Sequence, residues 1–220
     1  MIITIDGPAG SGKSTAAREL ARALGIAFLD TGATYRAVTL RALRSRVDLA
    51  EESALAELAR QMDIRFVPTD EGLRILLDGQ DVTSDLRTEE VSAASHHAAQ
   101  SPAVREVLVA LQRRLGQRLG SFVAEGRDQG SVVFPEADVK FYLDARPEVR
   151  ADRRHEQLLA AGQPSDRERV LEAIVRRDAL DTNRAVAPLV RPAGAIVIDT
   201  SQMGIADVVE ALVRHVGAHP

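Results

Sequence analysis

The stretch MIITIDGPAGSGKST, residues 1–15, decides the fold that we expect for this 220-residue chain. Residues 1–6 are a short β-branched apolar run, which predicts a buried strand. The chain leaves this strand at Gly7 and has the pattern of a helix from Thr15 to Ala23. Residues 7–14 therefore match G-x-x-x-x-G-K-[ST] in the context that the motif requires, with a strand before it and a helix after it.

A loop of this kind is typical of proteins that bind polyphosphates. Small residues let backbone N–H groups surround the phosphates, and the following helix adds its free N–H groups and the positive end of its dipole. Lys13 would bring a positive charge to the outer phosphates of such a ligand, and the Ser14 hydroxyl is a natural ligand for Mg²⁺. Only Lys13 and Lys140 are lysines among the 28 basic residues, so arginine supplies nearly all the other positive charge. The residues predicted in this stretch to bind the polyphosphate are Gly7, Ala9, Gly10, Ser11, Gly12, Lys13, Ser14 and Thr15.

The composition is that of a folded protein with a substantial core. Hydrophobic residues make up 45% of the chain, which argues against disorder. No apolar run approaches the about 18–20 residues of a membrane span, and without cysteine there is no disulfide or thiolate chemistry. Met1 leads directly into a strand, so we expect no signal peptide. The net charge of −4 weighs against broad nucleic-acid binding. We therefore expect a cytoplasmic protein without membrane or nucleic-acid partners, and a monomer, because no exposed apolar stripe is evident.

Strands and helices alternate along the chain in the manner of an α/β protein. This alternation predicts a parallel sheet flanked by helices, with ligands bound beyond the carboxyl ends of the strands. Thr31, Tyr35 and Arg36 follow the second strand and are therefore expected on the same side of the sheet as Lys13. The five strands predicted for this sheet are residues 1–6, 26–30, 121–125, 139–144 and 195–199.

Residues 63–100 interrupt this pattern. Two short apolar runs, 64–68 and 73–77, flank a turn at residues 69–72, which predicts an antiparallel hairpin. Within a parallel framework, such a hairpin favours a small substrate-binding subdomain, and a hairpin with only a surface role is the alternative. Ser101 and Pro102 then predict the start of a long helix, as N-cap and first helical residue.

Residues 146–191 are unusually rich in arginine. Arg150 and Arg154 fall on one helix face, and Arg177, Asp181 and Arg184 recur on another. One interpretation is an exposed helical hairpin held by salt bridges, since eight carboxylates accompany the arginines. The other is a lid whose arginines neutralise reacting phosphates. The arginines of this segment are Arg146, Arg150, Arg153, Arg154, Arg167, Arg169, Arg176, Arg177, Arg184 and Arg191.

Distinctive runs occur along nearly the whole chain, at residues 5–15, 29–36, 125–135, 140–145, 177–178, 181–189 and 198–201. Together they resemble the bacterial cytidylate kinases, a family of P-loop nucleoside monophosphate kinases. Gly126-Arg127-Asp128 and the run Asn183–Leu189 carry more of this resemblance than the phosphate-binding loop does. The resemblance implies a P-loop kinase fold, an α/β five-stranded parallel sheet flanked by helices, with a small antiparallel insertion and a helical lid. The implied division is a core of residues 1–62, 101–145 and 185–220, a CMP-binding insertion of residues 63–100, and a lid with flanking helices at 146–184.

The resemblance also implies a reaction, the transfer of the γ-phosphoryl group of ATP to CMP or dCMP with Mg²⁺ as cofactor, in pyrimidine nucleotide metabolism. The acceptor phosphate is already ionised, so no general base is expected, and catalysis consists of in-line positioning and charge neutralisation. A lid would exclude water from the closed site. The residues implied as catalytic are Lys13, Arg36, Arg127, Arg154 and Arg184, with Arg150 and Arg153 as further lid arginines that bind ATP.

The implied acceptor site draws on several parts of the chain. Its expected members are a phosphate clamp of Arg36, Arg127 and Arg184, cytosine contacts from Arg105 and Asp128, ribose contacts from Thr31, Arg177 and Asp181, and a further contact from Tyr35.

One position departs from the family's pattern. Family members commonly place a base-contacting serine in the helix after the insertion. Here that serine aligns with His96 when Pro102 and Arg105 are matched, and Ser95 is its neighbour. Both Ser95 and His96 are therefore candidates for the CMP-binding contact.

Other functions can be set against this one. A P-loop kinase for shikimate, dephospho-CoA or another nucleotide would share the loop, but the Gly-Arg-Asp turn and the hairpin insertion argue against it through the resemblance. A GTP-binding switch would need an Asn-Lys-x-Asp motif, whereas the only asparagine, Asn183, is followed by Arg184. A catalytically idle nucleotide sensor would be expected to have lost Lys13 or the arginine cluster, and both are present.

Overall fold

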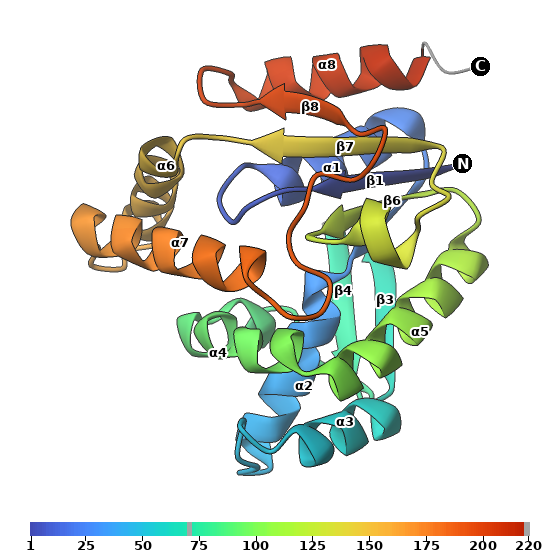
Figure 1. The fold of residues 1–220 in the computed structure, drawn as a ribbon, viewed down its shortest axis with the longest axis vertical. Coiled ribbons are helices and arrows are strands. Elements are labelled where there is room, and N and C mark those ends of the chain that lie inside the picture. Colours follow the sequence, from blue (N-terminus) through green and yellow to red (C-terminus); the bar gives the residue numbers. More distant parts are fainter. Residues whose placement is uncertain (70–71, 218–220) are drawn as a thin grey trace. The chain divides into compact units, whose positions relative to one another are not determined.

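The computed structural model describes residues 1–69 and 72–217 and divides into two compact units. Unit 1 comprises Met1–Phe28 and Leu119–Pro220, and unit 2 is the continuous segment Leu29–Arg118. Each unit has its own hydrophobic core, and Figure 1 labels the elements of both. None of the helices in residues 1–69 and 72–217 has the length and apolar character that crossing a bilayer would require.

Unit 1 is built on a five-stranded sheet in the order β2-β6-β1-β7-β8. β1 pairs in parallel with both β6 and β7, and β7 pairs in parallel with β8. The predicted parallel sheet is therefore confirmed, and the chain passes from unit 1 to unit 2 within β2. The strands are β1 (Ile2–Asp6), β2 (Ala27–Asp30), β6 (Phe122–Gly126), β7 (Val139–Asp144) and β8 (Ile196–Asp199).

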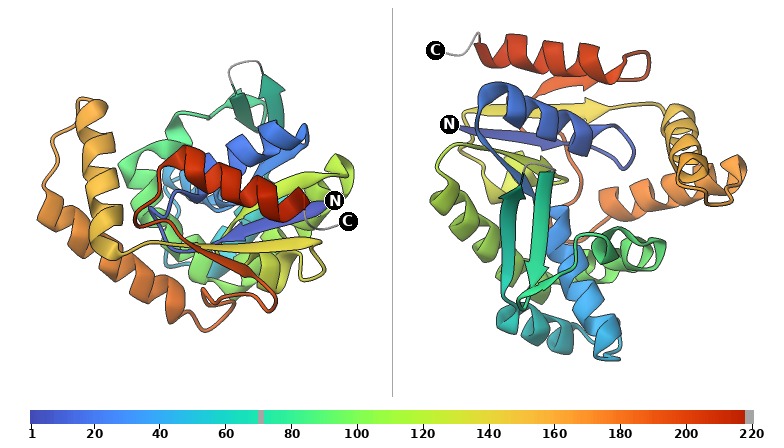
Figure 2. Two further views of the ribbon diagram at one scale, coloured as in Figure 1. Left: turned by 90° about the horizontal axis from the view of Figure 1, so that it is seen from above. Right: turned by 180° about the vertical axis from the view of Figure 1, so that it is seen from behind.

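Two helices complete the core of unit 1. α1 (Lys13–Leu24) and α8 (Ile205–Gly217) pack against each other, and Figure 2 shows them side by side. Their buried side chains join those of β1 and β7 in one cluster. α1 begins two residues before its predicted start, so the lysine of the loop belongs to its first turn. Gly25, with φ of 64°, ends the helix in the left-handed conformation common at this position.

A helical pair follows β7 in unit 1. α6 (Pro147–Ala160) has proline in its first turn, and α7 (Arg167–Thr182) is capped by the Asp166 carboxylate, which accepts the N–H groups of Glu168 and Arg169. Figures 1 and 2 show the two helices packed side by side. An exposed ion pair between Asp152 of α6 and Arg167 of α7 joins them.

Unit 2 combines helices with the predicted hairpin. β3 (Ile64–Thr69) and β4 (Gly72–Leu77) pair antiparallel, while Asp70 and Glu71 of the predicted turn lie outside the described residues. Buried side chains of both strands share one core with those of four helices. The hairpin is thus an integral part of a packed unit. The helices are α2 (Gly32–Arg44), α3 (Glu52–Gln61), α4 (Glu89–Gln100) and α5 (Pro102–Leu119).

Three short elements have no counterpart in the sequence prediction. β5 (Gln80–Asp81) extends the hairpin into a three-stranded sheet, and η1 (Asp85–Arg87) precedes α4. η2 (Gln129–Val133) is a turn of π-helix directly after β6. Such elements are too short to show a hydrophobic period, so sequence patterning does not reveal them.

Candidate active site

The phosphate-binding loop owes its shape to its glycines. Gly7, Gly10 and Gly12 have φ values of 147°, 78° and 88°, which side chains rarely adopt. At Gly7 a Cβ atom would lie 2.0 Å from the carbonyl oxygen of Leu143 at the end of β7. Glycine is therefore the one residue type that lets the loop leave β1 alongside β7.

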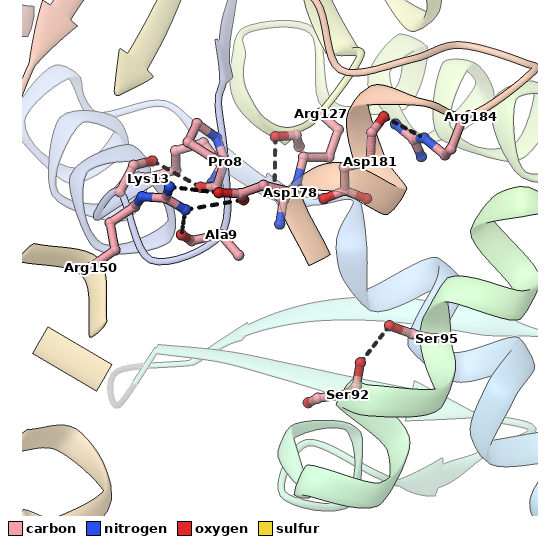
Figure 3. Close-up of polar contacts among 12 residues, drawn as sticks. Pro8, Ala9, Lys13, Ser92, Ser95, Arg127, Arg150, Asp178, Asp181 and Arg184 are labelled. Carbon is pink, nitrogen blue, oxygen red and sulfur yellow. Dashed lines mark hydrogen bonds and ion pairs between the residues drawn. The ribbon is translucent and has the colours of Figure 1, made fainter. Parts of the chain in front are cut away.

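Lys13 lies buried inside this loop. Its Nζ donates a hydrogen bond of 2.6 Å to the carbonyl oxygen of Pro8, as Figure 3 shows. Burial lowers the pKa of Lys13 to about 7, and the positive charge of Arg127 acts in the same direction. Glu125 and Asp181 oppose this effect. An anion bound in the loop would therefore favour the charged form of Lys13, which burial and Arg127 disfavour in the protein alone.

The remaining loop residues are held by short local contacts. Ser11 is buried, and its hydroxyl donates to the Pro8 carbonyl at 3.1 Å. Thr15 is exposed in the first turn of α1. Ser14 is also exposed, and its Oγ donates a 2.8 Å hydrogen bond to Glu125 at the carboxyl end of β6. A hydroxyl and a carboxylate, both hard oxygen donors of the kind that Mg²⁺ binds, thus lie together.

Asp6 is a second carboxylate that the sequence analysis did not select. Its two oxygens accept the backbone N–H groups of Gln129 and Gly130 at 2.8 and 2.7 Å. Burial raises the pKa of Asp6 to about 6, although these two hydrogen bonds lower it. Asp6 therefore anchors the π-helical turn that directly follows Arg127 and Asp128. The available signal for Asp6 and Glu125 was their position at or next to the carboxyl ends of β1 and β6.

Arg127 and the end of α7 form a charged cluster in unit 1. The Nε of Arg127 donates to Asp181 at 2.8 Å, and the Nε of Arg184 donates to the Asp181 backbone carbonyl at 3.3 Å (Figure 3). Burial alone would raise the pKa of Asp181, but Arg127, Arg177 and Arg184 hold it below its usual range. Burial would likewise lower the pKa of Arg127, and Asp181 outweighs it. The structure thus brings these four predicted residues together.

The predicted lid arginines have three different environments. Arg150 is buried, and its guanidinium donates to the Ala9 carbonyl of the loop and to Asp178 of α7. Arg153 is half-buried and donates to the Thr200 hydroxyl and carbonyl. Arg154 is exposed and has no hydrogen bond or ion pair with any residue in the described ranges 1–69 and 72–217. Arg154 alone of the three therefore presents its guanidinium outward without a protein partner among those residues.

Unit 2 holds its own predicted residues in hydrogen-bonded pairs. Arg36 forms an ion pair of 2.8 Å with Asp30, whose other oxygen accepts the Ala33 N–H at the start of α2. Arg105 of α5 is buried and donates to the Tyr35 hydroxyl at 3.1 Å, with its guanidinium 5.7 Å from the Tyr35 ring centroid. These contacts fix the side chains of both arginines before any ligand binds.

Further polar groups of unit 2 form a chain that ends at Thr31. The buried amide of Gln112 donates to Thr34 at 2.9 Å, and the Thr34 hydroxyl donates to the Thr31 carbonyl at 2.7 Å. Thr31 itself is buried directly before α2. Gln112 was not a predicted site residue, because a lone polar residue on an apolar helix stripe gives no functional signal.

Ser95 and His96 lie side by side on α4 but differ in exposure. Ser95 is buried and donates to the Ser92 carbonyl at 2.8 Å (Figure 3), whereas His96 is half-buried with its Nδ1 2.7 Å from the Ala93 carbonyl. Both side chains therefore already have a backbone partner one turn earlier.

Comparison with known proteins adds independent findings. A family model described as "Cytidylate kinase" matches residues 3–218. A cytidylate kinase from Pelotomaculum thermopropionicum is 48% identical over 217 residues, which cover 98% of this chain and 96% of that protein. A cytidylate kinase from Salmonella paratyphi B is 47% identical over 214 residues, covering 97% of this chain and 94% of that protein.

Solved structures agree with the fold. The crystal structure of TT1252 from Thermus thermophilus has a TM-score of 0.50 and 22% identity, over 99% of this chain and 96% of that one. Shikimate kinase from Bacteroides thetaiotaomicron has a TM-score of 0.51 and 13% identity, over 99% and 98%. At these identities the likeness concerns the fold alone, which is that of the P-loop kinases. The family match over nearly the whole sequence and the identity to its members are decisive, and the chain belongs to the cytidylate kinase family.

Proposed function

We propose that this chain transfers the γ-phosphoryl group of ATP to CMP or dCMP, giving ADP and CDP or dCDP in pyrimidine nucleotide metabolism. Family membership supports the proposal. The observation that carries it is the buried Lys13 in its glycine loop, beside the charges of Arg127, Asp181 and Glu125. Such an ammonium gains its full charge when phosphates occupy the loop.

The donor residues that we propose are those of the loop and the first turn of α1, together with Arg153 of the lid. Backbone N–H groups of the loop would bind the phosphates, with Lys13 as the positive charge at the outer ones. The hydroxyl of Ser14 and the carboxylate of Glu125 fit Mg²⁺, and these two groups would hold it. When bound, the ion would neutralise part of the charge of the outer phosphates.

The transfer step itself needs no proton acceptor from the protein. An ionised oxygen of the CMP phosphate attacks the γ-phosphorus. The bond between the γ-phosphorus and the oxygen that joins it to ADP breaks at the same time. Lys13 and the arginines stabilise the charge that spreads over the moving phosphoryl group. Arg154 is the lid arginine that we propose for this role, since no described residue occupies its guanidinium.

We propose the following acceptor contacts. Arg36, Arg127 and Arg184 would bind the CMP phosphate, Arg105 and Asp128 the cytosine, and Thr31, Arg177 and Asp181 the ribose. Tyr35 would bind a further group, with Ser95 or His96 as the contact from α4. We keep residues 63–100 as the CMP-binding insertion and 146–184 as the lid region, and we propose a cytoplasmic monomer.

The experiment that tests the proposed function is ADP formation from Mg-ATP with one acceptor at a time. CMP, dCMP, UMP, AMP, GMP, shikimate and dephospho-CoA are each supplied alone. We expect turnover with CMP and dCMP to exceed that with all the others. Turnover only with another acceptor would contradict the cytosine assignments but not the donor site. The absence of any acceptor-dependent ADP would contradict the kinase reaction.

Asp128→Ala should reduce the preference for CMP over UMP by about tenfold, the effect of losing one hydrogen bond to a base edge. The KM values for CMP and UMP, which also reflect the binding of their phosphate groups, should change by a smaller factor. The ratio of kcat/KM values for CMP and UMP measures this preference. Glu136→Ala is the control, since Glu136 is exposed and lies, like Asp128, in the segment between β6 and β7. An unchanged CMP-to-UMP ratio in Asp128→Ala would remove Asp128 from the base site.

Binding of ADP should take up close to one proton at about pH 8. With its pKa lowered to about 7, Lys13 is mostly neutral in the free chain at this pH, and bound phosphates bring it back toward its ordinary charged state. At about pH 6, Lys13 is charged with or without ligand, so little uptake is expected. Calorimetry in two buffers of different ionisation enthalpy measures the proton count. No uptake at the higher pH would mean that Lys13 is already charged in the free chain.

A further inference from the structure

Arg150 makes more hydrogen bonds than the other lid arginines, and one of them reaches the phosphate-binding loop. We propose that Arg150 and Asp178 are a positioning pair, which orients the Ala9–Gly10 peptide of the loop and so sets the affinity for the donor nucleotide. The inference rests on the proposed function, because it concerns how the donor is held. It replaces the direct contact with ATP that the sequence led us to expect of Arg150.

Four hydrogen bonds hold the Arg150 guanidinium. Its Nε donates to the Ala145 carbonyl at 2.8 Å, one terminal nitrogen donates to Ala9 at 2.9 Å and Asp178 at 3.0 Å, and the other donates to Asp178 at 2.6 Å. The Arg150 side chain is 3% exposed, whereas that of Asp178 is 23% exposed. Arginine has five N–H donors in a rigid fork, so these bonds leave it little capacity for a phosphate. Figure 3 shows the fork between the loop and Asp178.

The bond to Ala9 has a consequence for the loop. A trans peptide is planar, so its C=O and its N–H point in opposite directions. Because the Ala9 carbonyl points at Arg150, the N–H of Gly10 points away from Arg150. Backbone N–H groups are what such a loop offers to phosphates. Arg150 therefore orients one donor of the loop without touching the ligand.

Gly10 also packs directly against Arg150. A Cβ atom at Gly10, whose φ is 78°, would lie 3.1 Å from the Cβ atom and 3.5 Å from the carbonyl oxygen of Arg150. The absence of a side chain at Gly10 thus lets the loop approach α6 closely enough for the hydrogen bond from Arg150 to Ala9.

Asp178 extends this arrangement into α7. Asp178 lies one helical turn before Asp181, which accepts the hydrogen bond from Arg127. The bidentate bridge from Arg150 to Asp178 therefore connects the loop to the helix that carries Arg177 and Asp181. Bidentate arginine–carboxylate pairs fix direction as well as distance, which is the property that a positioning role requires.

Removal of the Asp178 charge distinguishes this proposal from a direct phosphate contact. If Arg150 bound ATP itself, Asp178→Asn would release Arg150 toward the phosphates, and ADP affinity would rise or stay unchanged. If the pair positions the loop, the same change loosens the fork and ADP affinity falls. The two hypotheses thus predict opposite signs.

The experiment compares Asp178→Asn with Asp152→Asn in the full-length chain. Asp152 also bridges α6 and α7, through Arg167, but that pair is exposed and has no contact with the loop. ADP binding is measured by calorimetry, the KM for ATP and kcat with CMP by steady-state kinetics, and stability by thermal unfolding. We expect Asp178→Asn to weaken ADP binding by about tenfold and to lower kcat by about 10–100-fold, as misplaced binding groups do. Asp152→Asn should stay within about twofold of the wild type, as an exposed pair allows.

A second variant tests the fork itself. Arg150→Lys keeps the charge but loses the planar set of donors, so it should show the same loss as Asp178→Asn. If Asp178→Asn does not fold, Asp178→Glu is used, because it keeps the charge and displaces the carboxylate.

Three results would overturn the positioning role. They are ADP affinity in Asp178→Asn at or above the wild-type value, wild-type kinetics in Arg150→Lys, and a fall in melting temperature with no change in ADP affinity. Measurements on the wild-type chain distinguish a failure of the positioning proposal from a failure of the proposed function. If that chain neither binds ADP nor phosphorylates CMP, the proposed function fails, whereas normal wild-type activity with unaffected variants contradicts only the positioning pair.

Discussion

Replacing Lys13 with methionine should lower kcat by about 10²–10³-fold, the loss that follows when one group that stabilises transition-state charge is removed. Lys13 is the charge placed within the phosphate loop, and methionine fills nearly the same volume without it. The measurement is ADP formation from Mg-ATP and CMP. Turnover within about tenfold of the wild type would contradict the donor-site assignment.

Stability should not fall with activity in this variant. Since the folded-state pKa of Lys13 lies below its ordinary value of 10.5, folding disfavours the charged form. The charge therefore costs stability below about pH 7, and this cost disappears as the pH rises through the folded pKa toward the unfolded one. Lys13→Met removes the cost, so its melting temperature near neutral pH should equal or exceed that of the wild type. Lys140→Met, a change at the only other lysine, is the matched control and should leave kcat unchanged.

Gly7→Ala should destabilise the fold by about 3–5 kcal/mol, a large fraction of the stability of an ordinary domain. The added Cβ would lie 2.0 Å from the oxygen and 3.0 Å from the carbon of the Leu143 carbonyl, both backbone atoms of β7. Neither atom can rotate away as a side chain could. The loop or the end of β7 has to move, and the backbone at φ of 147° is strained as well.

A matched substitution isolates the contribution of this contact. Gly25 also has a positive φ, at 64°, but a Cβ there would meet nothing within 4 Å. Gly25→Ala should therefore cost only about 1–2 kcal/mol, the penalty for the left-handed conformation. Chemical unfolding of both variants measures the difference. A loss in Gly7→Ala no larger than that in Gly25→Ala would mean that β7 does not constrain the loop.

The sequence was sufficient for the parts of this fold that are governed by local patterns. The loop of residues 7–14 and the five strands follow from glycine spacing and from apolar runs, and both are confirmed. The hairpin was predicted for the same reason, with β3 and β4 within a residue of their expected bounds. The π-helical turn after β6 has no such pattern, because the Asp6 carboxylate anchors it from a distant part of the chain.

The candidate site was predicted less completely, because the spacing of residues along a helix does not tell how deeply each side chain is buried. Arg150 and Arg154 are four residues apart, which places them on one face of α6. Arg150 belongs to the first turn, against the end of β7 and the loop, and is buried there, whereas Arg154 lies one turn further out and is exposed. Glu125 was seen only as the end of a strand, and its hydrogen bond to Ser14 needs the three-dimensional fold.

The way the chain is divided between the units has a consequence for its synthesis on the ribosome. Unit 2 is one uninterrupted segment, so its synthesis is complete once residue 118 has been added. β1, in contrast, is made before unit 2, yet it pairs with β6 and β7, which come only after unit 2. During translation the apolar side chains of β1 therefore have no partner strands at the stage when all core residues of unit 2 have already been synthesised. The nascent phosphate-binding loop acquires its shape late, when Leu143 and Arg150 arrive to hold it.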